Sequence, residues 1–159
     1  WVYLKWISAM PPRRLEYSNT RLVTPAEYSA SGKTENYVVM NKRGWTGNLH
    51  AYKTMEKYGV QILAIPGPLK AALNRIKPVD AKNDKGYIFL NNKFTTLSKS
   101  QFSHFVKQVW KKYAGKDWTQ NTIRSIKVSS VWTPGSENPI KLAEAMGHDI
   151  KTAILHYKV

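Results

Sequence analysis

The 159-residue chain contains no cysteine and few acidic residues. Without cysteine it has no disulfide framework, no thiolate nucleophile and no cysteine-based zinc site, which fits an intracellular protein. The uncharged stretch Gly59–Leu69 contains two prolines and is much shorter than the ~20 apolar residues that cross a bilayer. These absences predict a soluble protein that does not contact a membrane.

The scarcity of acidic residues leaves a strongly basic chain, with 25 Lys and Arg against 10 Asp and Glu and a net charge of +15. Residues 1–60, 61–100 and 101–159 each carry +5, so the charge is not confined to a tail. Hydrophobic residues make up 42% and aromatic residues 12% of the sequence, which favours a folded body with a basic surface. The length suits one domain, and a polyanion is the expected partner.

Three strand-like runs follow an opening helix: Asn36–Asn41, Leu49–Thr54 and Val60–Ile65. They are rich in β-branched and aromatic residues and are separated by turns that contain glycine. They predict a small three-stranded antiparallel sheet. The spacing of Leu69, Leu73 and Ile76 then indicates a short helix.

Helical patterns dominate the rest of the chain. Ser98 and Gln101 match a capping box, and apolar residues recur at helical spacing after them, namely Phe102, Phe105, Val106, Val109, Trp110 and Tyr113. Further helices are predicted from Thr119 through Ile123, Ile126 and Trp132, from Asn138 to Gly147, and from Asp149 onward. The overall prediction is an α+β fold that is mainly helical.

Several motifs that would indicate other enzymes are incomplete. Gly32-Lys33-Thr34 resembles the end of a P-loop, but Glu27 stands where that motif requires glycine. The four histidines lack the spacing of a helical zinc site, and the acidic residues are too scattered to predict a two-metal cluster. We therefore expect neither a metal nor a nucleotide cofactor.

Basic and aromatic residues at the two ends of the chain suit phosphoryl transfer without a metal. Such chemistry needs cations that bind the phosphate oxygens, an acid for the leaving oxygen and a nucleophile. The candidates stand in a set order along the chain: Arg13 with Glu16, Lys53, Asn121 with Arg124, Met146-Gly147-His148, and Tyr157 nine residues after that histidine.

This order resembles the catalytic domain of the tyrosine recombinases, the integrase family of phages and mobile elements, over nearly the whole chain. The family signature is an Arg with an acidic residue three positions later, a Lys on a β-hairpin, a His-x-x-Arg box, a Gly-His turn and a Tyr nine residues on. Arg14 and Lys57 are the alternatives to Arg13 and Lys53. The Pro-Pro-Arg-Arg sequence before Leu15 is similar to recombinases of eukaryotic DNA viruses and virophages.

The resemblance implies site-specific cleavage and rejoining of double-stranded DNA through a 3′-phosphotyrosyl intermediate, with no ATP or metal. Tyr157 would be the nucleophile and Lys53 the acid for the 5′ oxygen. The phosphate would be bound by Arg13, Asn121, Arg124 and His148. Asn121 departs from the family, which has histidine there, and an amide cannot exchange a proton near neutral pH.

The resemblance also implies other protomers in a DNA-bound synaptic assembly. The chain begins with Trp1 and ends two residues after Tyr157, so we expect residues 1–159 to be a single catalytic domain without the family's N-terminal DNA-binding domain and C-terminal tail helix. Two other functions account for the same features: DNA relaxation like that of a type IB topoisomerase, and noncatalytic nucleic-acid binding by a basic module.

Overall fold

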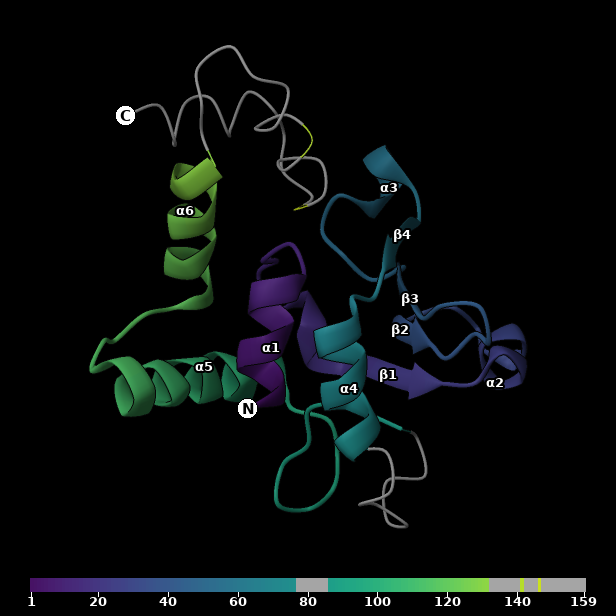
Figure 1. Cartoon of the computed structure of the whole chain (residues 1–159), viewed down its shortest axis with the longest axis horizontal. Coiled ribbons are helices and arrows are strands. Elements are labelled where there is room, and N and C mark those ends of the chain that lie inside the picture. The colour runs from purple at the N-terminus through teal and green to yellow at the C-terminus, as the bar shows by residue number, and fades with distance from the viewer. Residues whose placement is uncertain (77–85, 132–140, 142–145, 147–159) are drawn as a thin grey trace.

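The computed structural model describes residues 1–76, 86–131, 141 and 146. Helices and strands alternate over the first half, and longer helices follow (Figure 1). The elements are α1 (Val2–Ala9), the 3₁₀ helix η1 (Glu16–Asn19), β1 (Thr20–Val23), α2 (Pro25–Ala30), β2 (Asn36–Val39), β3 (Thr46–Leu49), α3 (Met55–Tyr58), β4 (Gln61–Ala64), α4 (Gly67–Ile76), α5 (Lys99–Ala114) and α6 (Gln120–Val131). The predicted helices from Asn138 and Asp149 lie outside the described residues, apart from Lys141 and Met146.

The sheet has four strands in the order β1-β2-β3-β4, and it is mixed. β1 pairs in parallel with β2, while β2–β3 and β3–β4 are antiparallel. The antiparallel pairing predicted for three strands holds for β2, β3 and β4, but the predicted number of strands is wrong, because β1 is a fourth strand and its parallel pairing makes the sheet mixed. The prediction also missed α2, whose crossover joins the two parallel strands, as parallel pairing requires.

The outer edge of β1 is covered by the segment that begins at Gly86. The Leu22 amide donates to the Gly86 carbonyl oxygen at 2.7 Å, and the Ile88 amide donates to Thr20 at 3.0 Å. Gly86 has a φ of +66°, and a Cβ there would lie 2.6 Å from the Leu22 carbonyl oxygen. Only glycine fits both constraints, so this residue permits the edge of the sheet to be covered.

Aromatic side chains form the main core beneath α1. Tyr3 makes edge contacts with the rings of Phe89, Phe102 and Phe105, and Trp6 does so with Tyr17 and Phe89. α1 lies in the middle of the molecule and packs against α4 (Figure 1). A smaller core on the sheet comprises Val23, Tyr37 and Val39, with Tyr28 of α2 against it. Edge-to-face contacts add to the stabilisation that the buried area provides.

The cap motifs predicted for the two long helices are confirmed. Ser98 and Gln101 make both bonds of a capping box at the start of α5, which ends at Gly115 in the left-handed conformation. On α5, Phe102 and Val106 are fully buried as predicted, but Tyr113 is 62% exposed. On α6, Ile123 is buried whereas Ile126 is 44% exposed, so the buried face is rotated from the predicted one.

The side chain of Asn36 on β2 ties three segments together inside the protein. Its Nδ2 group donates to the carbonyl oxygens of Glu16 and Ala51, and its Oδ1 atom accepts from the amides of His50 and Ala51, at 2.7–3.1 Å. Asn36 is fully buried. All of its bonding capacity is used, and the chain that leaves β3 is held next to η1.

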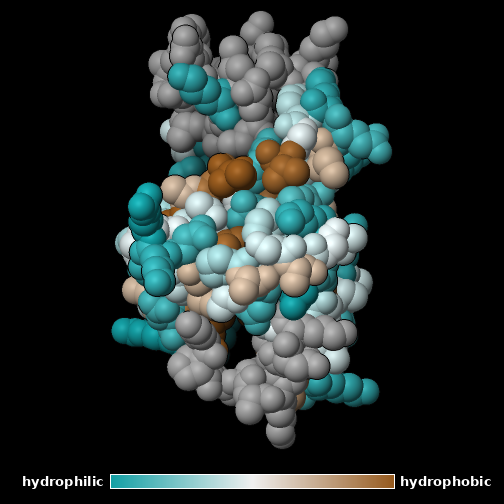
Figure 2. All heavy atoms as spheres, turned by 90° about the vertical axis from the view of Figure 1, so that its right-hand side faces the viewer, coloured by the Kyte–Doolittle hydropathy of each residue, from teal (hydrophilic) through white to brown (hydrophobic). Residues whose placement is uncertain are grey.

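The side of the molecule that lies on the right in Figure 1, where α2 protrudes, is mostly hydrophilic around a small hydrophobic patch (Figure 2). β4 ends the strand order and exposes Ile62 and, just before the strand, Val60. Among the described residues, no helix has the length and apolar character that crossing a membrane demands.

We predict that Asn36→Ala lowers the free energy of unfolding by about 3 kcal/mol, because it leaves buried amides and carbonyl oxygens without partners. Urea denaturation measures the change. Asn92→Ala, at an asparagine exposed in a loop, is the matched control and should change stability by less than ~0.5 kcal/mol. A loss below ~1 kcal/mol at Asn36 would show that water replaces its bonds.

Candidate functional site

The candidate site is built around Arg13, which follows two prolines at the end of α1. Proline cannot continue a helix, so the chain turns away after Met10. The Tyr17 hydroxyl donates to the Pro11 carbonyl oxygen at 2.7 Å and fixes this turn. Arg13 is only 1% exposed, whereas its neighbour Arg14 is exposed. Of the two arginines considered for the first box, Arg13 is the one that the fold holds in place.

The guanidinium of Arg13 contacts one residue in the connection between β3 and β4 and the first residue of β4. It lies over the Tyr52 ring, 4.5 Å from the centroid, and Nη2 donates to Oε1 of Gln61. Burial lowers the pKa of Arg13, while nearby Tyr17 and Glu16 raise it. The group still carries its charge at neutral pH. A buried cation in one fixed orientation is suited to binding an anion.

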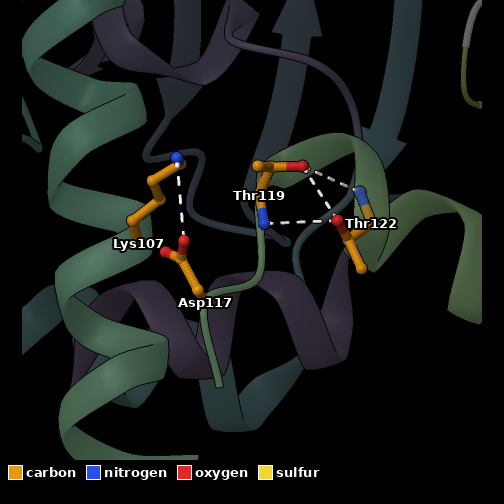
Figure 3. A network of polar contacts seen from close by, with 4 residues as sticks. All are labelled: Lys107, Asp117, Thr119 and Thr122. Carbon is orange, nitrogen blue, oxygen red and sulfur yellow. Dashed lines mark hydrogen bonds and ion pairs between the residues drawn. The ribbon is translucent and has the colours of Figure 1, made fainter. Parts of the chain in front are cut away.

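The second cation, Arg124, lies on α6, and the start of that helix is well defined. The Thr122 amide donates to the Thr119 hydroxyl at 3.1 Å, and the Thr119 amide donates to the Thr122 hydroxyl at 3.3 Å (Figure 3). This reciprocal pair confirms Thr119 as the N-cap. In the preceding loop, Asp117 pairs with Lys107 of α5 at 4.0 Å, an exposed contact that contributes little stability.

Arg124 is 4% exposed, and Asn121, one turn earlier, is exposed. Nη1 of Arg124 donates to Oδ1 of Asn121 at 3.3 Å. Because an arginine can only donate, the amide oxygen must face it and the Asn121 NH₂ group points the other way. The pair predicted from the substituted box is therefore in contact, and the amide remains a donor toward its surroundings.

Gln120, the first residue of α6, connects this helix to the Arg13 segment. Its Nε2 group donates to the Arg13 carbonyl oxygen at 2.7 Å, and its Oε1 atom accepts from the Tyr3 hydroxyl at 2.7 Å. Both bonds are buried. The two ends of the described chain that carry predicted site residues are thus joined directly.

Lys53 lies four residues beyond the end of β3, in the turn that leads to α3, and its side chain is exposed. It lines a cleft of about 480 Å³ together with two further cations, Arg14 and Lys99, with Tyr52 and with one acidic residue, Glu16. Tyr52 also stacks on Arg13, so this cationic cleft adjoins the buried guanidinium. The alternative lysine, Lys57, lies on α3 with its ammonium 5.3 Å from the centre of the Tyr58 ring.

The predicted residues His148 and Tyr157 lie outside the described residues. Met146, which opens the Gly-His box, is 3% exposed. Sequence reasoning missed Tyr52, Gln61 and Gln120. A signal existed for Gln120, because a glutamine and an arginine four residues apart share the helix face that also buries Ile123. Nothing in the sequence marks Tyr52 or Gln61 as neighbours of Arg13. Within the described ranges, no group of three His, Asp or Glu side chains forms a metal site.

The chain resembles known proteins in its structure, but no match was found at the level of sequence. No family model matches the chain, and no curated protein matches it. Among solved structures, the crystal structure of XerA recombinase superposes with a TM-score of 0.66 at 16% sequence identity. The chain has a tyrosine recombinase-like fold. The match covers 99% of this chain and 51% of the XerA chain, so the present chain spans about half of that protein.

We predict that Arg13→Met keeps or raises the free energy of unfolding, by 0 to about 2 kcal/mol, because an apolar side chain of similar length needs no compensation for burying a charge. Arg13→Ala should lower it through the cavity that it leaves. Urea denaturation measures both, and exposed Arg14→Met is the control. A loss above ~1 kcal/mol in Arg13→Met would identify Arg13 as a structural residue.

Proposed function

We propose that this chain cleaves and rejoins double-stranded DNA as the catalytic domain of a site-specific recombinase. The observation that carries the proposal is the pair of buried arginines, Arg13 and Arg124, on segments that Gln120 joins within a tyrosine recombinase-like fold. A guanidinium binds two phosphate oxygens at once, and two preoriented guanidinium groups stabilise the charge that develops on a phosphate under attack. The net charge of +15 supports a polyanionic substrate.

The reaction requires a nucleophile and a proton donor in addition to the arginines. In the proposed mechanism the Tyr157 oxygen forms a bond to the phosphorus as the bond to the 5′ oxygen breaks, and Lys53 gives its proton to that oxygen. His148 hydrogen-bonds the phosphate and assists removal of the tyrosine proton. Attack by a 5′ hydroxyl on the phosphotyrosine then restores the DNA and the tyrosine. The bond energy is conserved, so the mechanism uses neither ATP nor a metal.

The cationic cleft supports a path for the DNA backbone beside the buried arginines. Arg14, Lys53 and Lys99 present three positive charges there against the one negative charge of Glu16, next to the ring on which Arg13 lies. Contacts of this kind position a duplex without reading its sequence. We propose that residues 1–159 act as one catalytic domain and that further protomers join it on DNA.

Covalent capture tests the proposal directly. The full chain is mixed with a pool of nicked duplexes whose central sequence is randomised, so that a short cleaved strand diffuses away and the protein–DNA adduct persists on a denaturing gel. Joining of the bound strand to a second duplex separates recombination from topoisomerase-like relaxation. DNA binding without any adduct would favour a noncatalytic basic module.

We predict that Tyr157→Phe abolishes the adduct while DNA affinity stays within about twofold, because the substitution removes a single hydroxyl group. Gel-shift and denaturing-gel measurements on the same samples give both values. Tyr113→Phe, at a tyrosine that is 62% exposed on α5, is the matched control and should cleave normally. An adduct formed by Tyr157→Phe would assign the nucleophile to another residue.

We predict that Lys53→Ala slows cleavage by about 10²- to 10⁴-fold, the usual contribution of a general acid, with little change in binding. A substrate with sulfur at the 5′ bridging position should restore the rate, because a thiolate leaves without a proton. Lys57→Ala is the control and should cleave both substrates at the rate of the unaltered chain. Sulfur rescue of Lys57→Ala instead would move the acid to α3.

We predict that Arg124→Ala lowers the single-turnover cleavage rate by at least 10²- to 10³-fold, because it removes a charged donor to the transition state. Asn121→Ala removes a neutral donor and a contact to Arg124, so its loss should be about tenfold. Because Arg124 is buried, its replacement can also destabilise the fold, so thermal melts are used to check that each variant is folded. Equal losses in the two variants would show that the amide matters as much as the charge.

A further inference from the structure

The buried side-chain amide of Gln120 makes two hydrogen bonds, one through its oxygen and one through its nitrogen, to residues far away in the sequence. It is 3% exposed, and its two partners lie 117 and 107 residues away in the sequence. The proposed reaction assigns no chemical step to it. A polar side chain that is buried at the first turn of a helix costs free energy unless its bonds are made, so its presence there calls for an explanation.

The chemistry of the two partners fixes the orientation of this amide. Burial raises the pKa of Tyr3 far above its ordinary value, so the hydroxyl stays protonated and donates to Oε1. The Arg13 carbonyl oxygen can only accept, so it requires the NH₂ group. A reversed amide would place Oε1 against the Arg13 carbonyl oxygen, so that two acceptors would face each other there.

Because Gln120 lies on α6, the fixed orientation of its amide affects the position of Arg124. Gln120 and Arg124 are four residues apart and share the buried face of the helix. The bond to the main chain of Arg13 therefore sets the turn before Arg124 against the segment that carries the other buried arginine. Asn121, which contacts Arg124, directly follows the same residue.

We propose that Gln120 is a positioning residue that sets the distance and angle between the two arginines for one phosphate. This inference rests on the proposed function, since it concerns the same site. Errors of about 1 Å in the placement of reacting groups cost up to about 100-fold in rate. Gln120 thus acts on the rate of cleavage through Arg13 and Arg124, without touching the DNA.

Two substitutions at Gln120 separate positioning from stability. Gln120→Met keeps the length and loses both bonds, so we expect cleavage to fall about 10- to 100-fold while DNA affinity stays within about twofold. Gln120→Glu has the same shape, but its carboxylate cannot donate to the Arg13 carbonyl oxygen. The protonated acid both donates and accepts as the amide does. Its single-turnover rate, relative to the unaltered chain, should therefore rise as the pH falls from about 8 to 5.5.

Rates are corrected for the folded fraction, and Val39→Ala in the smaller core serves as a destabilised control that should cleave normally once folded. Recovery of Gln120→Glu at low pH, with no recovery of Gln120→Met, supports positioning. Full-rate cleavage by folded Gln120→Met, or the same pH dependence in both variants, overturns it. If the unaltered chain forms no adduct, the proposed function fails and this inference fails with it. If that chain cleaves and the variants cleave equally well, this inference alone fails.

Discussion

The burial of the Arg13 guanidinium is the constraint that sets the geometry of the candidate site. A charged group inside a protein is tolerated only where other groups replace its water. The groups that do so include the ring of Tyr52, in the β3–β4 connection, and the amide oxygen of Gln61, the first residue of β4. The carbonyl oxygen of the same arginine binds Gln120. The contacts of the Arg13 side chain and the hydrogen bond of its carbonyl oxygen thus hold the β3–β4 connection and α6 next to the end of α1.

Buried and exposed cations divide the work that a phosphate site requires. Arg13 and Arg124 are held by packing and hydrogen bonds, so little reorganisation is needed when charge develops on a ligand. Arg14 and Lys53 are exposed beside the cleft and keep their side-chain freedom. Exposed cations of this type give affinity for a polyanion that depends on salt, because binding releases counterions. Preorganisation and attraction therefore come from different residues.

Local signals in the sequence predicted the long helices, and nonlocal packing decided the sheet. The caps at Ser98 and Thr119 are short-range motifs and were predicted correctly. Thr24 with Glu27 is another capping box, with Pro25 at the first helical position. This local signal for α2 is present in the sequence, although the prediction did not include the helix. β3 begins earlier than predicted and contains Gly47, a poor strand residue. A Cβ at that position would approach Met10 and Ile65 within about 3.4 Å, a contact between distant segments that no local pattern records.

In the candidate site, too, contacts within one helix could be predicted from the sequence and contacts between distant segments could not. Gln120 is the exception. Arg124 and Asn121 were predicted together because a helix turn places them together, whereas the neighbours of Arg13 come from a strand and a turn about 40 to 50 residues away. Gln120 lies between these cases. On α6 the inward face carries two apolar residues, Ile123 and Val128, and two polar ones, Gln120 and Arg124. A polar side chain at a core position costs stability unless hydrogen-bond partners are provided for it. Proteins keep such residues where the bonds fix the geometry of a functional site. Polar residues that share a helix face with buried apolar ones are therefore the pattern in a sequence from which a positioning role can be inferred.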